Sequence, residues 1–321
     1  MYKILTYPVV VICGTNASGK SSLGIKLAKK YNGEIISADS RQIIRGFDLC
    51  CGKVSDEEKK IVPHHMIDIC DIGDTFSVSD YQKQVYELIP QIVKRNKMPF
   101  IVGGTGLYID AVIKGYNFYD EDINYNYREE LNNKSIQDLQ AMLSETATEY
   151  LKYNNSDFNN KRRLIRLIEK ESNGNPILPS NKALFNTLQI GVTWSKEMLF
   201  KRIDDRLAMR INQGMIDEVR DYLKNGGSFE NLYKLGLEYR YIAWYLQGKY
   251  SSIEEFLNEM SQAIKKYAKQ QIKWFKRNVT IQWIDMTQDY FSEACDLIDM
   301  FMKNGQLNKP GDIGCCRSGR G

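Results

Sequence analysis

PVVVICGTNASGKSSLGIKL, residues 8–27, is the stretch that decides the fold of this chain. Its apolar run, 9–13, is typical of a strand buried on both faces. The next eight residues, GTNASGKS, fit the pattern G-x-x-x-x-G-K-[ST]. Apolar residues at Leu23, Leu27 and Ala28 then have helical spacing. A strand, a glycine loop and a helix in this order are the context that a phosphate-binding loop requires.

This loop predicts how a phosphorylated ligand is held, but it names neither the ligand nor a reaction. Its glycines let successive backbone N–H groups curl around phosphate oxygens, and the helix N-terminus adds partial positive charge. Lys20 is expected to reach the outer phosphate, and the Ser21 hydroxyl to ligate Mg²⁺. The predicted phosphate-binding residues are Gly14, Thr15, Asn16, Ala17, Ser18, Gly19, Lys20 and Ser21.

Length and composition are those of an ordinary globular protein. The 321 residues suffice for one large domain with an elaboration, or for two domains. The net charge is only +4, so any nucleic-acid surface must come from local clustering of basic residues. No apolar run approaches the roughly 20 residues of a membrane span, and the N-terminus lacks the apolar core of a signal peptide. We therefore expect a cytoplasmic protein without a membrane segment.

Cysteine and histidine do not form a recognisable metal site. The seven cysteines contain no C-x-x-C pair, and Cys13 and Cys70 lie in apolar runs where small core residues are expected. His64 and His65 are the only histidines, and neither has a nearby Cys or Glu partner at ligand spacing. Structural hydrogen bonding is the favoured interpretation for both.

Two further strand ends carry candidate functional residues. Ile35 and Ile36 indicate a short buried strand with Asp39 at its carboxyl end, the edge at which open α/β sheets bind ligands. Asp39 is equally suited to capping the following turn. A strand at 99–102 ends in Gly-Gly-Thr105-Gly, a tight backbone that allows close approach of a ligand, although plain helix–sheet packing also explains it. Residues 62–69 predict another strand.

The chain changes character after residue 116. Helical patterns replace strands between about 120 and 185, which predicts a helical insertion at 118–187 between two halves of a core domain, 1–117 and 188–303. Residues 304–321 are expected to form a disordered tail. The helix predicted at 161–171 carries Arg162, Arg163 and Arg166 beside inward-facing apolar residues. This is either a solvated basic face or a contact for a nucleic-acid backbone.

Two long helices are predicted in the second half of the core. The first, 196–225, carries Arg202, Arg206 and Arg210 on one continuous face. The second, 252–277, mixes lysines with aromatic residues, which suits RNA binding or a packed core equally.

Several of these stretches together resemble one family. In chain order they are GTNASGKS, ISADSRQIIRGFD, PHHMIDI, FSVSDYQ, VGGTGLYI, the KRRLIR helix, GLEYR and YAKQQIKWFKR. They are similar to the tRNA dimethylallyltransferases, also called tRNA isopentenyltransferases, and they span nearly the whole chain. The glycine-rich VGGTGLYI and the DSRQ segment are the most specific of them.

The resemblance implies a fold and a reaction. The fold is α/β, a P-loop NTPase-like parallel sheet flanked by helices, with the helical insertion. The donor is dimethylallyl diphosphate, whose diphosphate sits in the loop with Mg²⁺ at Ser21. The acceptor is N6 of the adenosine immediately 3′ of the anticodon in a tRNA anticodon stem-loop. That base flips into a channel, at a cost of a few kcal/mol of unstacking.

The resemblance also implies roles for individual residues. Asp39 would accept the N6 proton, Thr105 would hold the diphosphate or the acceptor, and Arg240 would contact the leaving group. The residues expected to contact tRNA are Asp39, Ser40, Arg41, Gln42, Thr105, Arg128, Arg162, Arg163 and Arg166.

Some positions depart from the family pattern. They are Asn16, Ile44, Cys50, Cys51 and Gln270, and none of them is a residue to which we give a catalytic role. The Cys/His zinc finger of some eukaryotic members has no counterpart, which implies the compact bacterial type. We expect a monomer without an obligate protein partner.

Three other functions remain open on the residues alone. A small-molecule P-loop kinase would use Asp39 to activate a hydroxyl and ATP as donor. A prenyltransferase acting on free adenine nucleotides would share the chemistry without tRNA. A non-catalytic RNA-binding protein would keep its affinity for tRNA after Asp39→Ala.

Overall fold

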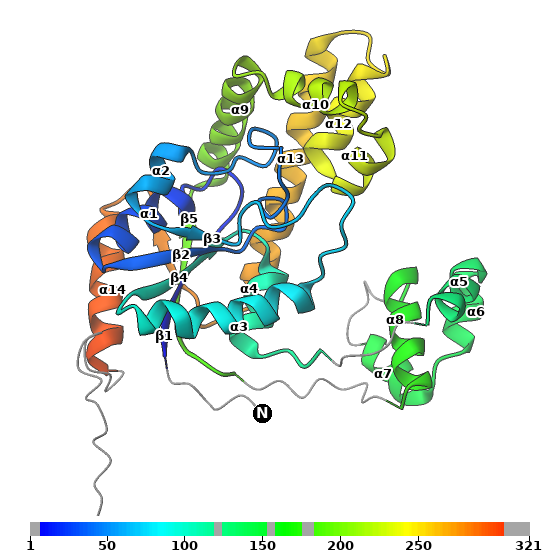
Figure 1. Ribbon diagram of the computed structural model, residues 1–321, viewed down its shortest axis with the longest axis horizontal. Coiled ribbons are helices and arrows are strands. Elements are labelled where there is room, and N and C mark those ends of the chain that lie inside the picture. Colours follow the sequence, from blue (N-terminus) through cyan, green and yellow to red (C-terminus); the bar gives the residue numbers. More distant parts are fainter. Residues whose placement is uncertain (1–6, 119–123, 153–157, 175–182, 305–321) are drawn as a thin grey trace, which may run out of the picture. The chain divides into compact units, whose positions relative to one another are not determined.

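A computed structural model describes residues 7–118, 124–152, 158–174 and 183–304 of the chain (Figure 1). The chain divides into two compact units. The larger one contains the chain up to Ile113 and again from Ala183 onward, and the smaller one is Lys114–Lys182. Each unit is described by itself below.

The larger unit is built on a six-stranded sheet in which every neighbouring pair is parallel, in the order β3-β2-β4-β1-β5-β6. β1 is flanked by β4 and β5, and all of its residues from Val9 to Cys13 are buried. This confirms the predicted central strand. The strands are β1 (Pro8–Cys13), β2 (Gly33–Ser37), β3 (His64–His65), β4 (Met98–Gly103), β5 (Asn186–Thr193) and β6 (Gln282–Asp285).

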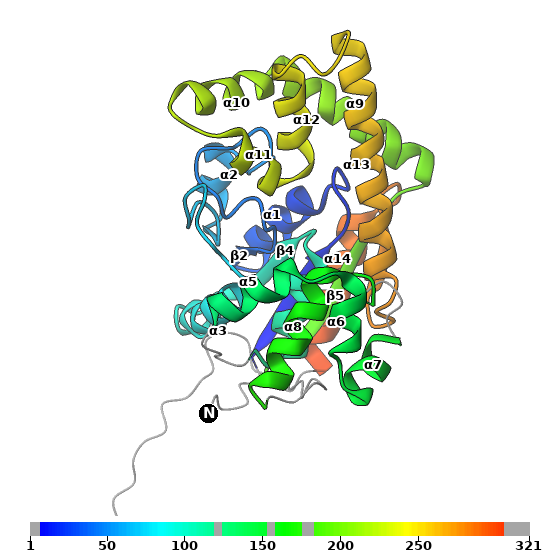
Figure 2. The same cartoon turned by 90° about the vertical axis from the view of Figure 1, so that its right-hand side faces the viewer.

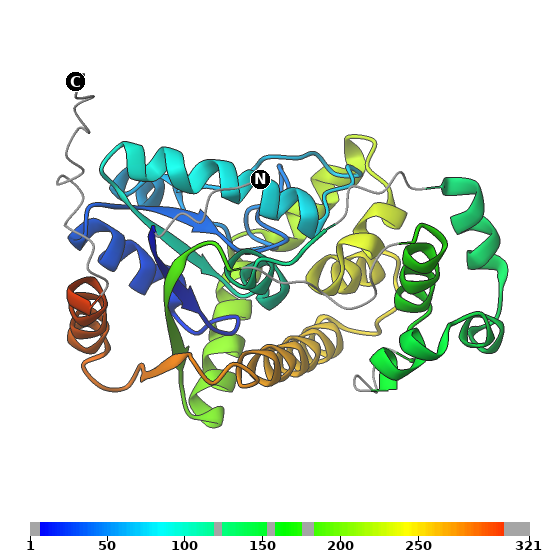
Figure 3. The same ribbon diagram turned by 90° about the horizontal axis from the view of Figure 1, so that it is seen from below.

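Helices cover both faces of the sheet, as the P-loop NTPase-like α/β class requires (Figures 1 and 3). Side chains of α1 (Lys20–Lys30) and α14 (Tyr290–Asn304) pack on one face, with Val10 and Ile12 of β1 beneath them. Side chains of α3 (Val78–Lys94) and α4 (Gly106–Lys114) pack on the other, over Val9 and Val11. The alternation along β1 thus divides one strand between two cores.

A layer of helices lies beyond the carboxyl ends of the strands (Figure 2). Its core joins Phe47 and Cys50 from the loop after β2 to buried residues of the later helices, such as Met215 and Tyr239. The short α2 (Asp56–Ile61) follows that loop and begins at a Ser55 capping box. The later helices are α9 (Lys196–Asn212), α10 (Met215–Lys224), α11 (Phe229–Leu235), α12 (Leu237–Leu246) and α13 (Ile253–Phe275).

Two of the predicted elements are corrected. The single helix predicted at 196–225 is two helices, because Gly214 has φ of 96° and ends the right-handed run between α9 and α10. The strand predicted at 62–69 is reduced to the two residues of β3. Met66 and Asp68 both have positive φ there, which ends the pairing with β2.

The smaller unit is helical, with α5 (Tyr125–Asn133), α6 (Ile136–Ala141), α7 (Glu145–Lys152) and α8 (Lys161–Ser172). Its core contains Leu164, Ile165 and Ile168 of α8, the three side chains that the sequence places inward. The exposed Arg162 and Arg163 lie on the opposite side of the same helix. This confirms the amphipathic pattern of the basic helix.

Across the residues that the structure describes, no helix is both long and apolar enough to span a membrane. Asn304 is the last residue of α14, and the tail predicted at 304–321 otherwise lies outside the described residues. Cys13 and Cys70 are buried, as predicted. His64 and His65 have the predicted structural bonds: the His64 ring Nδ1 lies 2.9 Å from the Val62 carbonyl, and His65 Nε2 lies 2.6 Å from Glu34.

Candidate active site

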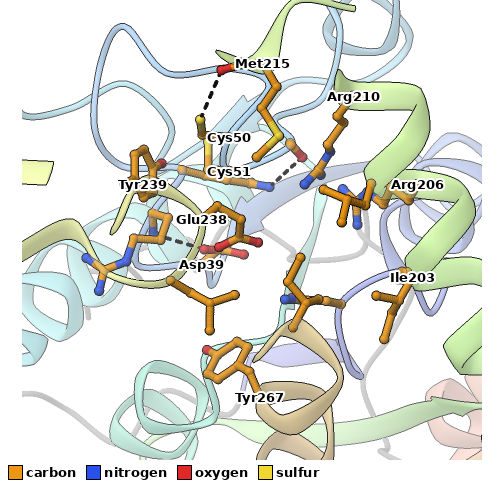
Figure 4. A pocket seen from close by; sticks show the side chains of 18 of the residues that line it. Asp39, Cys50, Cys51, Ile203, Arg206, Arg210, Met215, Glu238, Tyr239 and Tyr267 are labelled. Carbon is orange, nitrogen blue, oxygen red and sulfur yellow. Dashed lines mark hydrogen bonds between the residues drawn. The ribbon is translucent and has the colours of Figure 1, made fainter. Parts of the chain in front are cut away.

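A cavity of about 280 Å³ opens where the carboxyl ends of β1 and β2 meet the helical layer (Figure 4). The phosphate loop and the residues after β2 line it together, so sequence segments that were predicted separately form one site. From these two segments the lining residues are Asn16, Ala17, Lys20, Ser21, Asp39, Ser40, Arg41 and Gln42.

The phosphate loop is held in place by side chains from distant parts of the chain, which bond to its backbone. Arg202 Nε donates to the Ala17 carbonyl at 2.9 Å, and Trp194 Nε1 donates to the Ser18 carbonyl at 2.8 Å. Gln271 joins the loop to the second glycine-rich turn. Its Oε1 accepts the Asn16 N–H at 3.0 Å, and its Nε2 donates to the carbonyl of Gly104 at 2.9 Å. With these carbonyls occupied, the loop is fixed before any ligand binds.

Lys20 is buried at the start of α1, and its Nζ donates to the Thr15 carbonyl at 3.1 Å. The pKa of Lys20 is lowered to about 8, chiefly by burial and also by the nearby Arg206 and Arg210, while Asp39 opposes the shift. An anion placed beside Lys20 would offset the cost of keeping this ammonium charged and buried. The local electrostatics therefore favour a negatively charged ligand.

Asp39 lines the cavity and also caps the turn that follows it. Its Oδ1 accepts the N–H of Arg41 at 3.0 Å, so the predicted capping bond is present, and it leaves Asp39 in the lining of the cavity. Thr105 supports the same turn from β4, because its Oγ1 accepts the N–H of Ser40 at 3.0 Å and its own N–H donates to the Ala38 carbonyl at 3.0 Å. Thr105 thus contacts the residue next to Asp39 and lies outside the cavity lining.

Gly103 explains why the second glycine turn approaches so closely. A Cβ on Gly103 would overlap the backbone of Ala38, immediately before Asp39. The glycine is needed here for close contact between β4 and the chain after β2. Of the two open interpretations of this turn, the structure therefore shows the packing one, and this packing holds the chain that carries Asp39.

Three charged side chains in the cavity were not assigned a role from the sequence. Arg206 and Arg210 project into it from α9, and Glu238 lies in it at the start of α12 (Figure 4). The pKa of Arg206 is lowered to about 10, chiefly by burial and also by the neighbouring Arg210. Burial also raises the pKa of the Glu238 carboxyl. The spacing of the arginines was visible in the sequence, but the direction of their face was not.

Arg240 is not brought to this cavity. It is exposed, and its guanidinium donates to the carbonyl of Tyr233 at 3.2 Å. Glu238, two residues earlier, lines the cavity instead. Two residues correspond to about 200° around a helix, so both side chains cannot face the same space.

The predicted RNA-contact residues fall into two groups. Ser40, Arg41 and Gln42 line the cavity with Asp39. Thr105 belongs with this group through its bond to Ser40. The four arginines belong to the smaller unit, where Arg128 makes two bonds of 2.6 Å to the carboxylate of Glu169. Arg166 lies 3.7 Å from the same carboxylate, while Arg162 and Arg163 are exposed.

The aromatic residues of α13 lie in two different environments. Phe275 is buried, and Trp274 Nε1 donates to the carboxylate of Asp110 at 3.0 Å, so both belong to the core. Tyr267 instead lines the cavity. The composition of the helix alone did not distinguish these positions.

The donor set of the cavity fits Mg²⁺. The cation prefers oxygen ligands and is typically held by one or two protein oxygens together with phosphates. Ser21 lines the cavity beside the phosphate loop. It is the residue that would hold the ion.

A comparison with a family model and a comparison with individual relatives identify the same family. A family model described as IPP transferase matches residues 42–278. A protein of Shewanella sediminis named tRNA dimethylallyltransferase 2 is 38% identical over 302 residues, 91% of this chain and 98% of its own. A protein of the same name from Treponema denticola is 40% identical over 285 residues, 86% of this chain and 95% of its own.

Two solved structures that resemble this chain are also of isopentenyl- or dimethylallyltransferases. The crystal structure of a full-length tRNA isopentenylpyrophosphate transferase from Bacillus halodurans has a TM-score of 0.71 and 32% identity, covering 94% of this chain and 98% of its own. A eukaryotic dimethylallyltransferase crystallised acting on tRNA has a TM-score of 0.78, covering 95% of this chain and 81% of its own. At 22% identity, that second likeness is one of fold.

Proposed function

The chain belongs to the IPP transferase family, and from that premise we propose that it transfers the dimethylallyl group of dimethylallyl diphosphate to N6 of the adenosine 3′-adjacent to the anticodon of certain tRNAs, releasing diphosphate. One observation supports this reaction most strongly. Lys20 and Asp39, an anion-binding cation and a proton acceptor, line the same cavity.

The phosphate-loop side of the cavity binds the leaving group. Backbone N–H groups of the phosphate loop, apart from those of Asn16 and Ser18 that already bond within the protein, would add to the positive charge of the α1 N-terminus and the Lys20 ammonium. As the bond from C1 of the dimethylallyl group to the diphosphate oxygen breaks, the electron pair passes to that oxygen. Fixed positive charge is most useful there, because it stabilises the charge that develops in the transition state.

The Asp39 side of the cavity acts on the acceptor. Adenine N6 is a weak nucleophile, because its lone pair is delocalised into the ring. A carboxylate that accepts the N6–H orients the amine and takes its proton as the new bond from N6 to C1 forms. The turn that presents Asp39 is fixed by Thr105 and Gly103, which therefore act as positioning residues.

Mg²⁺ held by Ser21 would neutralise part of the diphosphate charge. The protein groups on the diphosphate side remain Lys20, the loop amides and the cavity arginines, whether or not the ion is present.

The tRNA contacts follow from exposure. Ser40, Arg41 and Gln42 line the cavity and would contact the flipped nucleotide. Arg162 and Arg163 are exposed on α8 and suit the phosphate backbone. The fork of Arg128 is bonded to Glu169, so its contribution to tRNA binding would be to hold the helices of the smaller unit together.

The test is incubation of the purified protein with Mg²⁺, dimethylallyl diphosphate labelled in the dimethylallyl group, and unmodified tRNA. Digestion of the RNA should give label only in N6-dimethylallyladenosine from the position 3′ of the anticodon. Transfer to free AMP with no preference for tRNA would indicate a nucleotide prenyltransferase. Loss of the γ-phosphate of ATP without need for the isoprenoid would indicate a kinase.

A further inference from the structure

The guanidinium groups of Arg206 and Arg210 lie together against Gly52. A Cβ on Gly52 would overlap nitrogen atoms of both side chains, so the two groups share one face of this glycine. Gly52 also has a φ of 59°, in the left-handed region. The glycine is therefore needed twice, for its backbone conformation and for the space that the two arginines occupy.

Two cations this close repel each other, and an anion bound between them would offset that repulsion. Within the described part of the chain, neither guanidinium has an ion pair or a hydrogen bond to a protein acceptor. Arg210 is nevertheless buried, with only 9% of its surface exposed. Asp39 and Glu238 line the same cavity, yet neither is within ion-pair distance of the arginines. A buried guanidinium without an ion pair is costly. Asp39 and Glu238 offset part of this charge from a distance, and an anionic ligand in the cavity would offset more of it.

The wall behind the arginines is firmly held. One Glu218 carboxylate accepts the N–H groups of Asp48 at 2.6 Å, Leu49 at 2.9 Å and Cys50 at 2.9 Å. Beyond Gly52, the Lys53 ammonium bonds to Asp48 and Asp68. The arginines therefore face a rigid loop on one side and the cavity on the other.

We propose that Arg210 is a diphosphate-binding residue that adds a second guanidinium beside Arg206 to the phosphate loop, and that it sets the preference of the site for diphosphate over a single phosphate. This deepens the proposed function and rests on it. Lys20, Arg206 and Arg210 supply three cationic groups on one side of the cavity, which suits an anion with two phosphoryl groups rather than one. A guanidinium fork contacts two phosphate oxygens at once, so an added fork contributes to selectivity as well as to affinity.

An acceptor-side role is the competing interpretation. Arg210 and Glu238 influence each other electrostatically, and Glu238 is in the same cavity as Asp39. If Arg210 served mainly to orient Glu238 toward the nucleotide, its loss would change tRNA binding and leave diphosphate binding intact.

The experiment measures binding of inorganic diphosphate and of orthophosphate to the full chain by calorimetry, without tRNA or donor. Wild type and Arg210→Met are compared with Arg220→Met, a matched change on α10 where the arginine is exposed and pairs with Asp217. We expect Arg210→Met to weaken diphosphate binding about tenfold or more, with a smaller change for orthophosphate. Arg220→Met should bind both as wild type does.

Equal diphosphate affinity in wild type and Arg210→Met overturns the proposal, as does an equal loss of affinity for diphosphate and for orthophosphate. An equal loss in Arg220→Met would also overturn it, because net charge would then explain the effect. If Arg210→Met does not fold, Gly52→Ala decides: its methyl group displaces the guanidiniums, and unchanged diphosphate affinity contradicts the proposal. Because no transfer is measured, failure here differs from failure of the wild-type enzyme to prenylate tRNA.

Discussion

Arginines of the two units differ in what neutralises their charge. In the smaller unit, Arg128 forms a two-pronged bond with Glu169, and Arg162 is exposed to water. In the larger unit, Arg206 and Arg210 are withdrawn from water without an acidic partner among the described residues. Residue type is the same in both places, but only the second arrangement needs a ligand to complete it. Burial without a partner identifies the site more sharply than a run of basic residues does.

The largest effect should come from removing the cation at the centre of the cavity. Lys20→Met is expected to lower the rate of prenyl transfer about a thousandfold, because the ammonium faces the charge that develops on the diphosphate. Single-turnover transfer of labelled donor measures this. Lys26→Met on the exposed face of the same helix should retain the wild-type rate. Comparable losses in both variants would show that the helix, and not the cavity, was damaged.

A loss of stability without a loss of chemistry is expected in the smaller unit. Glu169→Gln leaves Arg128 without its two-pronged acceptor and should lower the free energy of unfolding by about 2 kcal/mol. Urea unfolding measures it, with Glu130→Gln as the control, since Glu130 makes an exposed pair with Lys134. If Glu169→Gln instead changes the affinity for inorganic diphosphate, the claim that paired and unpaired arginines have different roles is contradicted.

The ion pairs of Glu34 should make stability depend on acid pH. Burial alone would raise the pKa of Glu34, but bonds from Arg95 and His65 outweigh it and hold the pKa below 4.5. This stabilisation is complete above 4.5 and is lost as the pH falls through the lower, folded-state pKa. Arg95→Met should cost about 1 kcal/mol at neutral pH, and the difference from wild type should shrink in acid. A difference that grows below pH 4.5 would contradict this sign.

The smallest effect is expected for an exposed arginine. Arg162→Met should leave stability within about 0.5 kcal/mol of wild type and reduce the salt dependence of tRNA binding by about one counterion. Filter binding of tRNA across a range of salt concentrations measures the slope. An unchanged slope would remove Arg162 from the RNA-contact residues.

The local patterns of the sequence predict a large part of this site. The phosphate loop and Asp39 are each tied to a strand end, and parallel strands bring their carboxyl ends to one edge. That rule places Lys20 and Asp39 together without knowledge of the packing. The structural role of His64 and His65 was likewise predicted from the absence of ligand partners, and both rings make structural hydrogen bonds.

What the sequence missed depends on tertiary packing. The shared face of Arg206 and Arg210 is visible in the sequence, but whether it meets water or a cavity depends on how α9 lies over the loop at Gly52. Arg240 was expected at the leaving group, yet the phase of α12 leaves Arg240 exposed and places Glu238 in the cavity lining. Similarly, Gln271 fastens the phosphate loop from 255 residues away, a contact that no local pattern contains.

The central claim is that one cavity separates two tasks, holding the diphosphate and accepting the proton of N6. It is tested most directly by the single-turnover rate of prenyl transfer in Asp39→Asn, at donor and tRNA concentrations that saturate the enzyme. An amide keeps the shape of the side chain but cannot take the proton, so we predict a rate about 10²- to 10⁴-fold below wild type. A rate within a few-fold of wild type would contradict the account.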